Sequence, residues 1–303
     1  MIDRRRWLTL ATAAAAAAVA PRFAHTAPMP LLQRAIPKSG EKLPVLGLGT
    51  SGSFDVDAGG SDGTAAREAL AAFAEGGATV VDSSPMYGRA ERAVGELAES
   101  LGLLPQLFIA TKIWTEGKEA GRKQLAQSHA LLKRDKLDLV QVHNLMDTAA
   151  HVATLREARD AGTVRYIGLT HYTRAAHDAL EREMVKHAVD FIQINYSPLE
   201  PEAGERLLDA AADARIAVLV NRPFADGALF DRVKGRELPP EAAVLGCTSA
   251  AQLALKWILA NPAVTCVLTG SRKATHIRDN LAGASGALPD AAQRKAIGAW
   301  FAG

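Results

Sequence analysis

The stretch TVVDSSPMYGRAERAVGELAESLGLLPQLFIATK (Thr79–Lys112) contains one complete structural repeat of the chain. A short apolar, β-branched run stands at each end of the stretch, and the two runs finish in Asp82 and Lys112. The segment between them, from Arg89 onward, places its apolar residues on one stripe and its charges elsewhere, as an amphipathic helix does. The stretch therefore predicts a strand, a helix and a second strand parallel to the first.

The same unit recurs along the chain. Eight apolar runs occur in the 303 residues, and segments of helical character separate most of them. Between Asp82 and Asn221 the runs end 25 to 31 residues apart, the length of one strand plus a crossover helix. Nearly continuous apolar strands are typical of a parallel sheet that is covered on both faces. The predicted strands are Val45–Thr50, Thr79–Ser83, Leu107–Lys112, Leu137–His143, Val164–Thr170, Phe191–Asn195, Ile216–Asn221 and Val264–Thr269.

Eight such units in about 250 residues predict an α/β fold, the (β/α)8 TIM barrel. A doubly wound open sheet is the alternative, but it usually has fewer strands and a G-x-G-x-x-G turn after the first one. The segment Gly47–Gly52 has the spacing of this motif, but no segment with the start of a helix follows it directly. Ahead of the first strand, Lys38–Glu41 lies between two extendable segments and predicts a β-hairpin that caps the barrel floor. We expect one barrel domain over residues 29–303.

The composition excludes some functions and leaves others open. With 48% apolar residues the chain can bury a large core, and 35 basic against 33 acidic side chains give a formal net charge of +2. This balance leaves no basic footprint for nucleic acid. Cys247 and Cys266 are the only cysteines, so they form no disulfide framework, and the sequence does not decide whether they pair. Cys266 lies in an apolar run and is interpreted as a core residue.

The N-terminus differs from the rest of the chain. Three arginines (Arg4–Arg6) precede Trp7 and Leu8, and an uncharged, alanine-rich run then extends to Ala20. A basic segment before a short apolar one is typical of a secretory signal, and the arginines before an aromatic residue and a leucine resemble the twin-arginine export motif. We predict a twin-arginine signal peptide over residues 1–28, recognition by the twin-arginine export machinery, and a periplasmic or otherwise exported protein that is not an integral membrane protein. A disordered tail or an uncleaved anchor is the alternative, and an unused signal would leave the protein in the cytoplasm.

Polar side chains stand at the ends of three consecutive predicted strands. Asp82 ends one strand and Tyr87 lies in the following loop, while Lys112 and His143 end the next two strands. In a TIM barrel the carboxyl ends of the strands carry the chemistry, so we expect the four side chains to meet. An ammonium near a phenol lowers the pKa of the phenol. We expect Lys112 to lower the pKa of Tyr87, Asp82 to hold Lys112, and His143 to orient a substrate carbonyl or share its proton.

Each of these residues also has a structural alternative. Asp82 can cap the next helix, and Tyr87 can pack its ring over a turn. Lys112 can be a solvated strand end, and His143 a rim residue with satisfied hydrogen bonds. Four compatible groups at three consecutive strand ends favour a common site over four separate structural roles.

Three segments resemble the active-site segments of the aldo-keto reductase superfamily, and the likeness extends from about Leu46 to Asn280. The resemblance implies that Asp82, Tyr87, Lys112 and His143 are the catalytic tetrad. It also implies that NADPH reduces a small-molecule carbonyl substrate, an aldehyde or ketone, without metal or flavin, and that the tyrosine gives a proton to the carbonyl oxygen. The three segments are VVDSSPMYGRAERAVGEL (Val80–Leu97), LFIATKIW (Leu107–Trp114) and DLVQVHNL (Asp138–Leu145).

The resemblance also implies a nicotinamide site at other strand ends. Gly49 lies in a segment similar to the family's glycine turn, where a missing side chain permits close backbone approach. Gln193 matches the glutamine that binds the carboxamide, whereas Thr170 and His171 replace a frequent Ser-Asn pair, and Asn221 replaces a tyrosine that stacks on the nicotinamide in some relatives. The residues expected at this end of the cofactor are Gly49, Thr50, Thr170, His171, Gln193 and Asn221.

The segment after the last predicted strand, Thr269–Asn280, resembles the family's site for the 2′-phosphate and the adenine. Ser271 matches a phosphate ligand and Asn280 an adenine contact, while His276 stands where many relatives carry a cation. Arg272 can compensate, because a guanidinium suits bidentate phosphate recognition. The resemblance therefore favours NADPH over NADH, and an ordinary basic helix start is the alternative.

Other functions remain possible on the same fold. A cofactor-binding sensor or regulatory subunit without significant turnover is one, because fold does not fix function and some relatives are channel-associated subunits. An unrelated barrel lyase or isomerase is another, but it would not need the Gln193 and Ser271 segments. The complete tetrad favours the enzyme. Met86, Trp114 and Phe224 are candidates for the pocket wall, or for packing.

Overall fold

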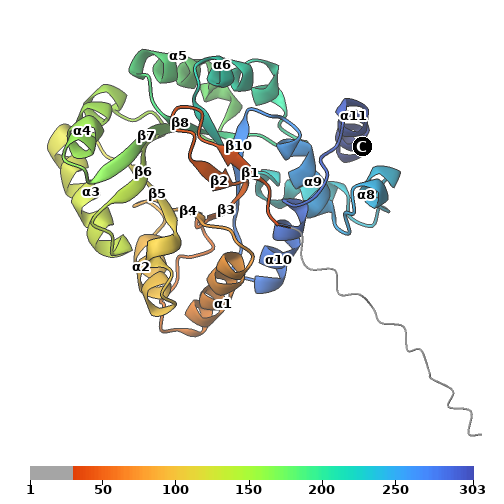
Figure 1. The fold of residues 1–303 in the computed structure, drawn as a ribbon, viewed down its shortest axis with the longest axis horizontal. Helices are drawn as coiled ribbons and strands as arrows, with labels where there is room; N and C mark the ends of the chain where they lie inside the picture. Colours follow the sequence, from red (N-terminus) through yellow and green to blue (C-terminus); the bar gives the residue numbers. More distant parts are fainter. Residues whose placement is uncertain (1–29) are drawn as a thin grey trace, which may run out of the picture.

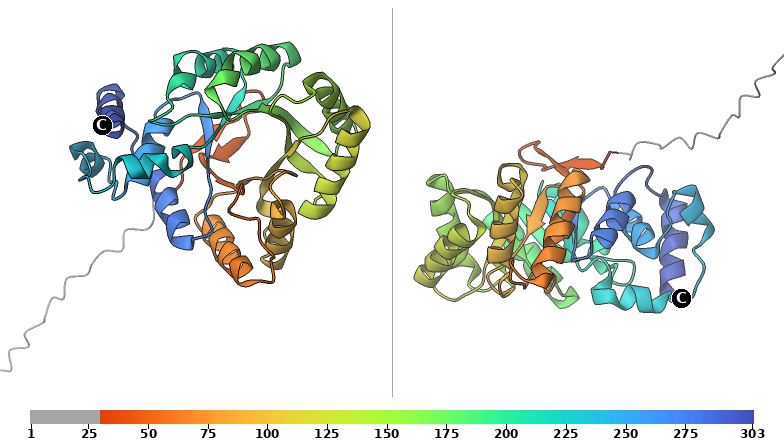
Figure 2. Two further views of the ribbon diagram at one scale, coloured as in Figure 1. Left: turned by 180° about the vertical axis from the view of Figure 1, so that it is seen from behind. Right: turned by 90° about the horizontal axis from the view of Figure 1, so that it is seen from below.

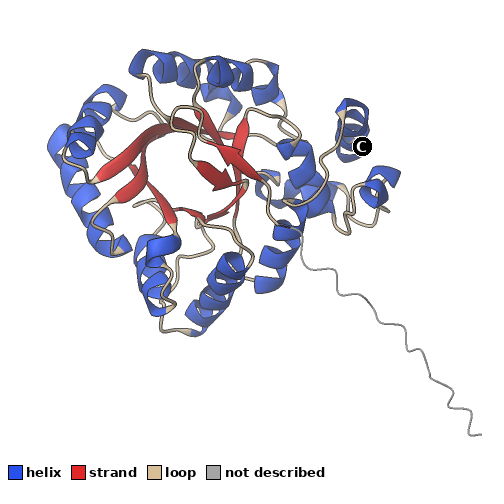
Figure 3. Ribbon diagram, in the orientation of Figure 1, coloured by secondary structure: helices blue, strands red, loops and turns tan. Residues whose placement is uncertain are grey.

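The computed structural model describes residues 30–303, so the predicted signal peptide lies outside the described residues. Within them, eight parallel strands close into a barrel in the order β10-β3-β4-β5-β6-β7-β8-β9. Figure 3 shows this barrel inside a ring of helices. The predicted (β/α)8 TIM barrel is thereby confirmed. Its strands are β3 (Leu46–Gly49), β4 (Val80–Asp82), β5 (Phe108–Ile113), β6 (Leu137–His143), β7 (Val164–Thr170), β8 (Phe191–Asn195), β9 (Ala217–Asn221) and β10 (Val264–Thr269).

The helices follow the strands in turn and cover the outside of the barrel (Figure 1). Two short helices, α7 and α8, and the C-terminal helix α11 are additional, and α8 and α11 contact each other beside α9. In the described residues, no helix is both long and apolar enough to cross a membrane. The helices are α1 (Ser61–Glu75), α2 (Ala90–Ser100), α3 (Lys118–Leu132), α4 (Thr148–Asp160), α5 (His177–His187), α6 (Leu207–Asp213), α7 (Ala228–Arg232), α8 (Pro240–Val244), α9 (Ala250–Leu259), α10 (Ala274–Gly283) and α11 (Ala291–Ala302).

The alternation of side chains along each strand divides the core into two layers. In β5, Phe108 and Ala110 belong to the cluster inside the barrel, whereas Ile109 and Ile113 belong to the larger cluster between the sheet and the helices. Successive side chains of a strand point to opposite faces. Lys112 therefore shares the inner face with Phe108 and Ala110, and this places its ammonium inside the barrel.

A β-hairpin closes one end of the barrel, as predicted. Strands β1 (Gln33–Ala35) and β2 (Lys42–Pro44) pair antiparallel, and Figure 2 shows them across one end of the molecule. Ile36 and Leu43 extend from the hairpin into the inner cluster, where they meet strand residues such as Phe108. The hairpin thus closes the end of the barrel opposite the strand carboxyl ends.

The two cysteines are separate and buried. Neither Cys247 nor Cys266 is in a disulfide. Cys266 is fully buried in the inner cluster, which confirms its interpretation as a core residue, and burial raises the pKa of its thiol far above the usual value. Both thiols therefore act as small apolar groups.

Candidate active site

The structure brings the four predicted catalytic side chains together at the carboxyl end of the barrel. Asp82 ends β4, Lys112 lies one residue before the end of β5, and His143 ends β6. Tyr87 follows in the loop between β4 and α2. The first three side chains are buried, with Lys112 at 0% exposure, and Tyr87 is half-buried. Asp82 does not cap the next helix, because α2 begins after Arg89.

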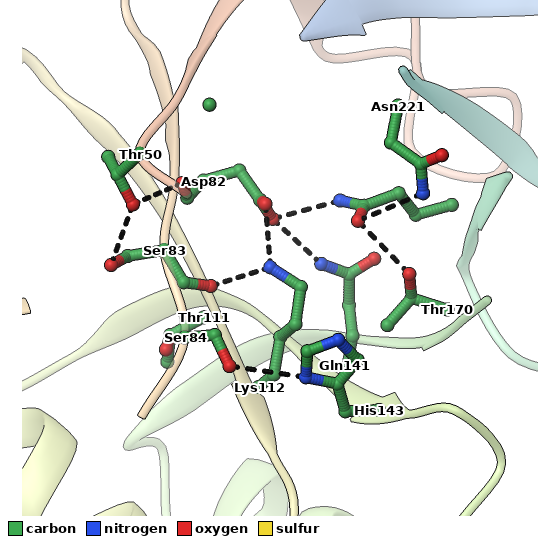
Figure 4. A network of polar contacts seen from close by, with 12 residues as sticks. Thr50, Asp82, Ser83, Ser84, Thr111, Lys112, Gln141, His143, Thr170 and Asn221 are labelled. Atoms are coloured by element: carbon green, nitrogen blue, oxygen red, sulfur yellow. Dashed lines mark hydrogen bonds and ion pairs between the residues drawn. The ribbon is translucent and has the colours of Figure 1, made fainter. Parts of the chain in front are cut away.

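Lys112 is the centre of this group. Its Nζ donates to Asp82 Oδ2 and to the Ser83 carbonyl, each at 2.6 Å, as Figure 4 shows. The same Nζ lies 4.8 Å from the centroid of the Tyr87 ring. The rings of Tyr87 and His143 are perpendicular, with centroids 6.0 Å apart. One ammonium therefore contacts both the carboxylate and the phenol, which is the arrangement that the sequence predicted.

The expected net lowering of the pKa of Tyr87 is wrong. Burial raises the pKa of Tyr87, and the opposing effect of the Lys112 ammonium is smaller, so the pKa lies above its ordinary value. For Lys112, burial lowers the pKa, but Asp82 and then Tyr87 outweigh it, and the ammonium stays charged. The prediction considered the neighbouring charge and omitted the desolvation of the phenol. At neutral pH the site therefore holds a protonated phenol beside a protonated amine.

His143 is neutral in this site. Burial, followed by the charges of Lys112 and His171, lowers the pKa of His143 from 6.5 to about 3. Its Nδ1 shares a hydrogen bond with Ser84 Oγ at 3.2 Å, which fixes the orientation of the ring. A neutral imidazole can donate or accept a hydrogen bond but brings no extra proton near pH 7. The geometry and charge favour the orienting role of His143 over proton sharing.

The lowered pKa of His143 predicts a pH-dependent stability. In the unfolded chain this histidine binds a proton below pH 6.5, whereas in the folded protein it does so only near pH 3. The folded state therefore loses stability as the pH falls through that window, by up to about 1.4 kcal/mol per pH unit. Urea unfolding at several pH values should show a shallower pH slope for His143→Gln than for the wild type. Equal slopes for the two proteins would contradict the assignment of a neutral, buried imidazole.

The Asp82 carboxylate is fully engaged. Lys112 holds Oδ2, while Gln141 Nε2 and Gln193 Nε2 donate to Oδ1 at 3.0 and 2.9 Å. Gln193 Oε1 in turn accepts from Thr170 Oγ1 at 3.0 Å. Two predicted cofactor residues are thus joined to the tetrad by hydrogen bonds. Gln141 was missed by the sequence analysis, although it lies two residues before His143 and so shares the inner face of its strand.

Gly49 and Thr50 differ in what they contribute to the site. Thr50 is buried, and its Oγ1 donates to the Asp82 carbonyl at 3.0 Å and contacts Ser83 Oγ at 3.0 Å, so it fixes the backbone that carries Asp82. A Cβ added at Gly49 would meet no atom closer than Leu268 Cβ, at 3.7 Å. The packing of the protein therefore does not require a glycine at this position.

A cleft of about 620 Å³ opens above the tetrad. It contains Asp82, Tyr87 and His143, and also Met86 and Phe224, two of the three predicted wall residues. The third, Trp114, is not among the described residues that line the cleft, and its side chain is 38% exposed elsewhere on the surface. The predicted cofactor residues that line the cleft are Gly49, Thr50, Thr170, His171, Gln193 and Asn221.

His171 and Asn221 form one wall of the cleft. Asn221 Nδ2 donates to the His171 carbonyl at 3.1 Å, which ties the end of β9 to the loop after β7. The His171 ring stacks on Tyr172, with centroids 5.5 Å apart, and its Nδ1 accepts from the Tyr172 backbone N–H at 3.0 Å. Burial, then the neighbouring His177, lowers the pKa of His171. Both side chains are thus positioned by contacts with the protein itself.

The predicted phosphate segment lies beyond the cleft, after β10. Ser271 Oγ and His276 Nδ1 are 3.2 Å apart, so the structure brings these two predicted residues together. Arg272 does not join them, because its guanidinium pairs with Asp62 of α1 at 3.1 Å. Asn280 is buried within α10, 5% exposed. Of the four residues expected at the adenine end, Ser271 and His276 contact each other, whereas Arg272 pairs with Asp62 and Asn280 is buried in α10.

Several cleft residues carried no signal in the sequence. Tyr172 and Arg222 line the cleft from the loops after β7 and β9, and Phe230 lines it from α7. Arg222 has a φ of 51°, in the left-handed region that side chains other than glycine seldom adopt. Neither loop has a periodic pattern, so the position of these side chains depends on the backbone path and could not be read from the sequence.

A closed (β/α)8 barrel with a Tyr–Lys–Asp–His group in a cleft at its strand carboxyl ends defines a barrel enzyme equipped for proton transfer. Residues 45–295 match a family model whose description is "Aldo/keto reductase family". The chain therefore belongs to the aldo/keto reductase family of oxidoreductases.

Relatives and solved structures agree with this assignment. Aldo-keto reductase YhdN of Bacillus subtilis (strain 168) is 27% identical over 271 residues, 75% of this chain and 81% of that protein. A probable voltage-gated potassium channel subunit beta of Oryza sativa subsp. japonica is 27% identical over 270 residues, 71% of this chain and 80% of that protein. The crystal structure of an aldo-keto reductase from Klebsiella pneumoniae in complex with NADPH has a TM-score of 0.73 at 21% identity, and the match covers 88% of this chain and 94% of that one. This last likeness concerns the fold.

Proposed function

We propose that this protein reduces an aldehyde or ketone to an alcohol with NADPH, and that Tyr87 is the proton donor. The observation that carries the proposal is the position of Lys112 Nζ, 2.6 Å from Asp82 Oδ2 and 4.8 Å from the centre of the Tyr87 ring. When bound, NADPH supplies the hydride that the carbonyl carbon receives. The carbonyl oxygen gains negative charge as this happens, and a protonated phenol beside it can neutralise that charge.

The four side chains have distinct parts in this reaction. Tyr87 donates its proton to the carbonyl oxygen, and the Lys112 ammonium stabilises the phenolate that remains. Asp82 keeps Lys112 charged and in place. Neutral His143 offers a hydrogen bond that orients the carbonyl in the cleft. The phenol must stay protonated until the oxygen becomes basic, and the raised pKa of Tyr87 meets this requirement.

The residues of the cleft fit the cofactor. Asn221 Oδ1 and Arg222 Nε are buried and have no hydrogen-bond partner among residues 30–303. Both residues line the cleft together with Gln193 and Gly49. Unsatisfied buried polar groups are rare in folded proteins and indicate a ligand or ordered water. We assign Gln193 and Asn221 to the nicotinamide end, and Ser271 and Arg272 to the phosphate end.

The direct test is turnover. Purified protein from residue 29 onward should oxidise NADPH when it is mixed with a panel of aldehydes and ketones. The loss of the absorbance of reduced nicotinamide measures this oxidation. Oxidation that depends on the carbonyl, together with recovery of the alcohol, supports the proposal. If the protein binds NADPH but no member of the panel oxidises it, the proposed reductase activity is wrong.

Arg272 gives a prediction about cofactor choice. Arg272→Ala should raise the Kd for NADPH about tenfold and leave the Kd for NADH almost unchanged, because a guanidinium bond to phosphate is lost only with NADPH. Asp62 competes for the same guanidinium at 3.1 Å, so Asp62→Asn should tighten NADPH binding. Fluorescence titration of the wild type and of both variants measures these constants. Equal losses for both cofactors in Arg272→Ala would show that Arg272 does not read the 2′-phosphate.

A second function has a specific observation in its favour. The match to the channel subunit beta extends over 270 residues, so a cofactor-binding regulatory subunit on this fold is the alternative proposal. Such a subunit would bind NADPH in the same cleft with little or no turnover. The turnover assay therefore separates the two functions with one sample.

We also propose that residues 1–28 direct export by the twin-arginine route. The sequence of Arg4–Leu8 supports this proposal, and these residues lie outside those that the structure describes. Replacement of all three arginines with lysine should retain the protein in the cytoplasm of a host that exports the wild type. Unchanged fractionation would remove the basis for the export proposal.

A further inference from the structure

Two glutamines hold the same oxygen of Asp82, and they differ in their access to the cleft. Gln141 Nε2 and Gln193 Nε2 both donate to Asp82 Oδ1, at 3.0 and 2.9 Å. Gln193 lines the cleft, whereas Gln141 is fully buried and is not among the described residues that line it. A ligand in the cleft can therefore reach one of the two amides and not the other.

The Gln193 amide is shared between Asp82 and the cleft. Its amide is a rigid plane whose oxygen accepts from Thr170 Oγ1 at 3.0 Å and whose nitrogen donates to Asp82. Asn221 Nδ2 lies 3.5 Å from the same oxygen. Turning this amide toward a ligand group weakens the bond at its other end. A ligand that turns the Gln193 amide thus weakens the support of the Asp82–Lys112 pair, whereas one that uses only the second N–H of Nε2 does not.

Burial of the Gln141 amide inside the barrel costs free energy of folding. Its Oε1 is buried and has no hydrogen-bond partner among residues 30–303. Gly168 lies beside it in the neighbouring strand β7, and a Cβ at Gly168 would come within 3.0 Å of Gln141 Cγ and of the Phe191 carbonyl oxygen. An apolar side chain would fill this space without leaving a buried acceptor unpaired. The one contact that the amide makes is the bond to Asp82.

We propose that Gln141 is a positioning residue that keeps Asp82, and through it Lys112, in place while Gln193 engages the nicotinamide carboxamide. The inference rests on the proposed function, because that function places the nicotinamide at Gln193. Gln193 is then the exchangeable donor to Asp82 and Gln141 the permanent one. The division lets the cofactor enter without releasing the carboxylate on which the ammonium depends.

The test compares two ligands that share the adenine end. NADPH reaches Gln193, whereas 2′,5′-ADP has the 2′-phosphate and adenine but no nicotinamide. Gln141→Met keeps the bulk of the side chain and removes the donor. It should raise the Kd for NADPH about tenfold, because Gln193 becomes the only amide that holds Asp82, and leave the Kd for 2′,5′-ADP unchanged. A merely structural role for Gln141 would change both constants or neither.

Gln141→Glu provides a rescue that depends on pH. Burial and the nearby Asp82 raise the pKa of the new carboxyl, which when protonated can donate to Asp82 as the amide does. The Kd for NADPH of Gln141→Glu should approach the wild-type value at acid pH and rise as the carboxyl ionises, whereas in Gln141→Met the ratio to wild type should not depend on pH. A Gln141→Met protein that binds NADPH as tightly as wild type overturns the proposal.

These titrations contain no carbonyl substrate, so the two proposals fail separately. A wild-type protein that binds NADPH but reduces no carbonyl overturns the proposed function alone. A parallel change of both ligands in Gln141→Met, or a Gln141→Glu protein without pH dependence, overturns the role of Gln141 alone.

Discussion

Replacing Tyr87 with phenylalanine should lower kcat for carbonyl reduction by about two to four orders of magnitude and leave the Kd for NADPH almost unchanged. The phenol lines the open cleft and lies beside the protonated Lys112, with its ring centre 4.8 Å from Nζ. Neutral His143 cannot replace it, because the pKa of His143 is about 3. Steady-state kinetics and a cofactor titration of the same variant measure both quantities.

Tyr166→Phe is the matched control for this variant. Tyr166 lies in β7 at the closed end of the barrel, where its hydroxyl donates to Glu41 of the hairpin at 2.7 Å. Removal of this hydroxyl should cost some stability and leave kcat unchanged. If Tyr87→Phe turns over like Tyr166→Phe, the proton comes from another group and the assignment of Tyr87 is wrong.

The fold was predictable because it depends on a local pattern that repeats. The strand runs, such as Leu137–His143, are mostly apolar, and most of them are followed by a segment of helical character, so eight units could be counted without any distant contact. The β-hairpin at Lys38–Glu41 had its own turn signal. Barrel closure, which pairs β10 with β3, then follows from the number of units rather than from any single residue.

The positions of the site residues were predictable from the sequence only for residues that stand at the end of a strand. Asp82, Lys112 and His143 meet because parallel strands in register bring their carboxyl ends together. The pKa of Tyr87 was not predictable, because it depends on burial by the whole cleft. The pairing of Arg272 with Asp62 was also not predictable from the sequence, because the two residues are 210 positions apart in the chain.

Gln141 is an intermediate case. Its strand alternates so that Leu139, Gln141 and His143 share the inner face, and a glutamine on an inner, buried face needs a partner. The pattern could therefore have identified a polar residue inside the barrel. It could not have identified Asp82 as the partner, because Asp82 belongs to a strand that is not adjacent to β6.

Replacing Lys112 with methionine should destabilise the protein by about 3–5 kcal/mol and abolish measurable turnover. Lys112 is fully buried, and its Nζ makes two bonds of 2.6 Å, to Asp82 Oδ2 and to the Ser83 carbonyl. Methionine fills the space but leaves the Asp82 carboxylate buried without a cation. Gln141 and Gln193 still donate to its other oxygen, but hydrogen bonds from neutral amides compensate only part of the lost charge. Urea unfolding measures the loss of stability.

A second substitution separates the two effects of losing Lys112. Lys112→Met leaves the Asp82 carboxylate without a cation, and Asp82→Asn removes that carboxylate charge. The double variant Asp82→Asn/Lys112→Met should therefore regain much of the lost free energy of unfolding, while its kcat stays at the level of Lys112→Met. The stability defect arises from an unpaired buried carboxylate, which asparagine relieves. The catalytic defect arises from a phenolate that no ammonium stabilises, which asparagine cannot relieve. A double variant no more stable than Lys112→Met would show that the buried pair is not the source of the loss, and one that recovered turnover would remove Lys112 from the proposed proton transfer.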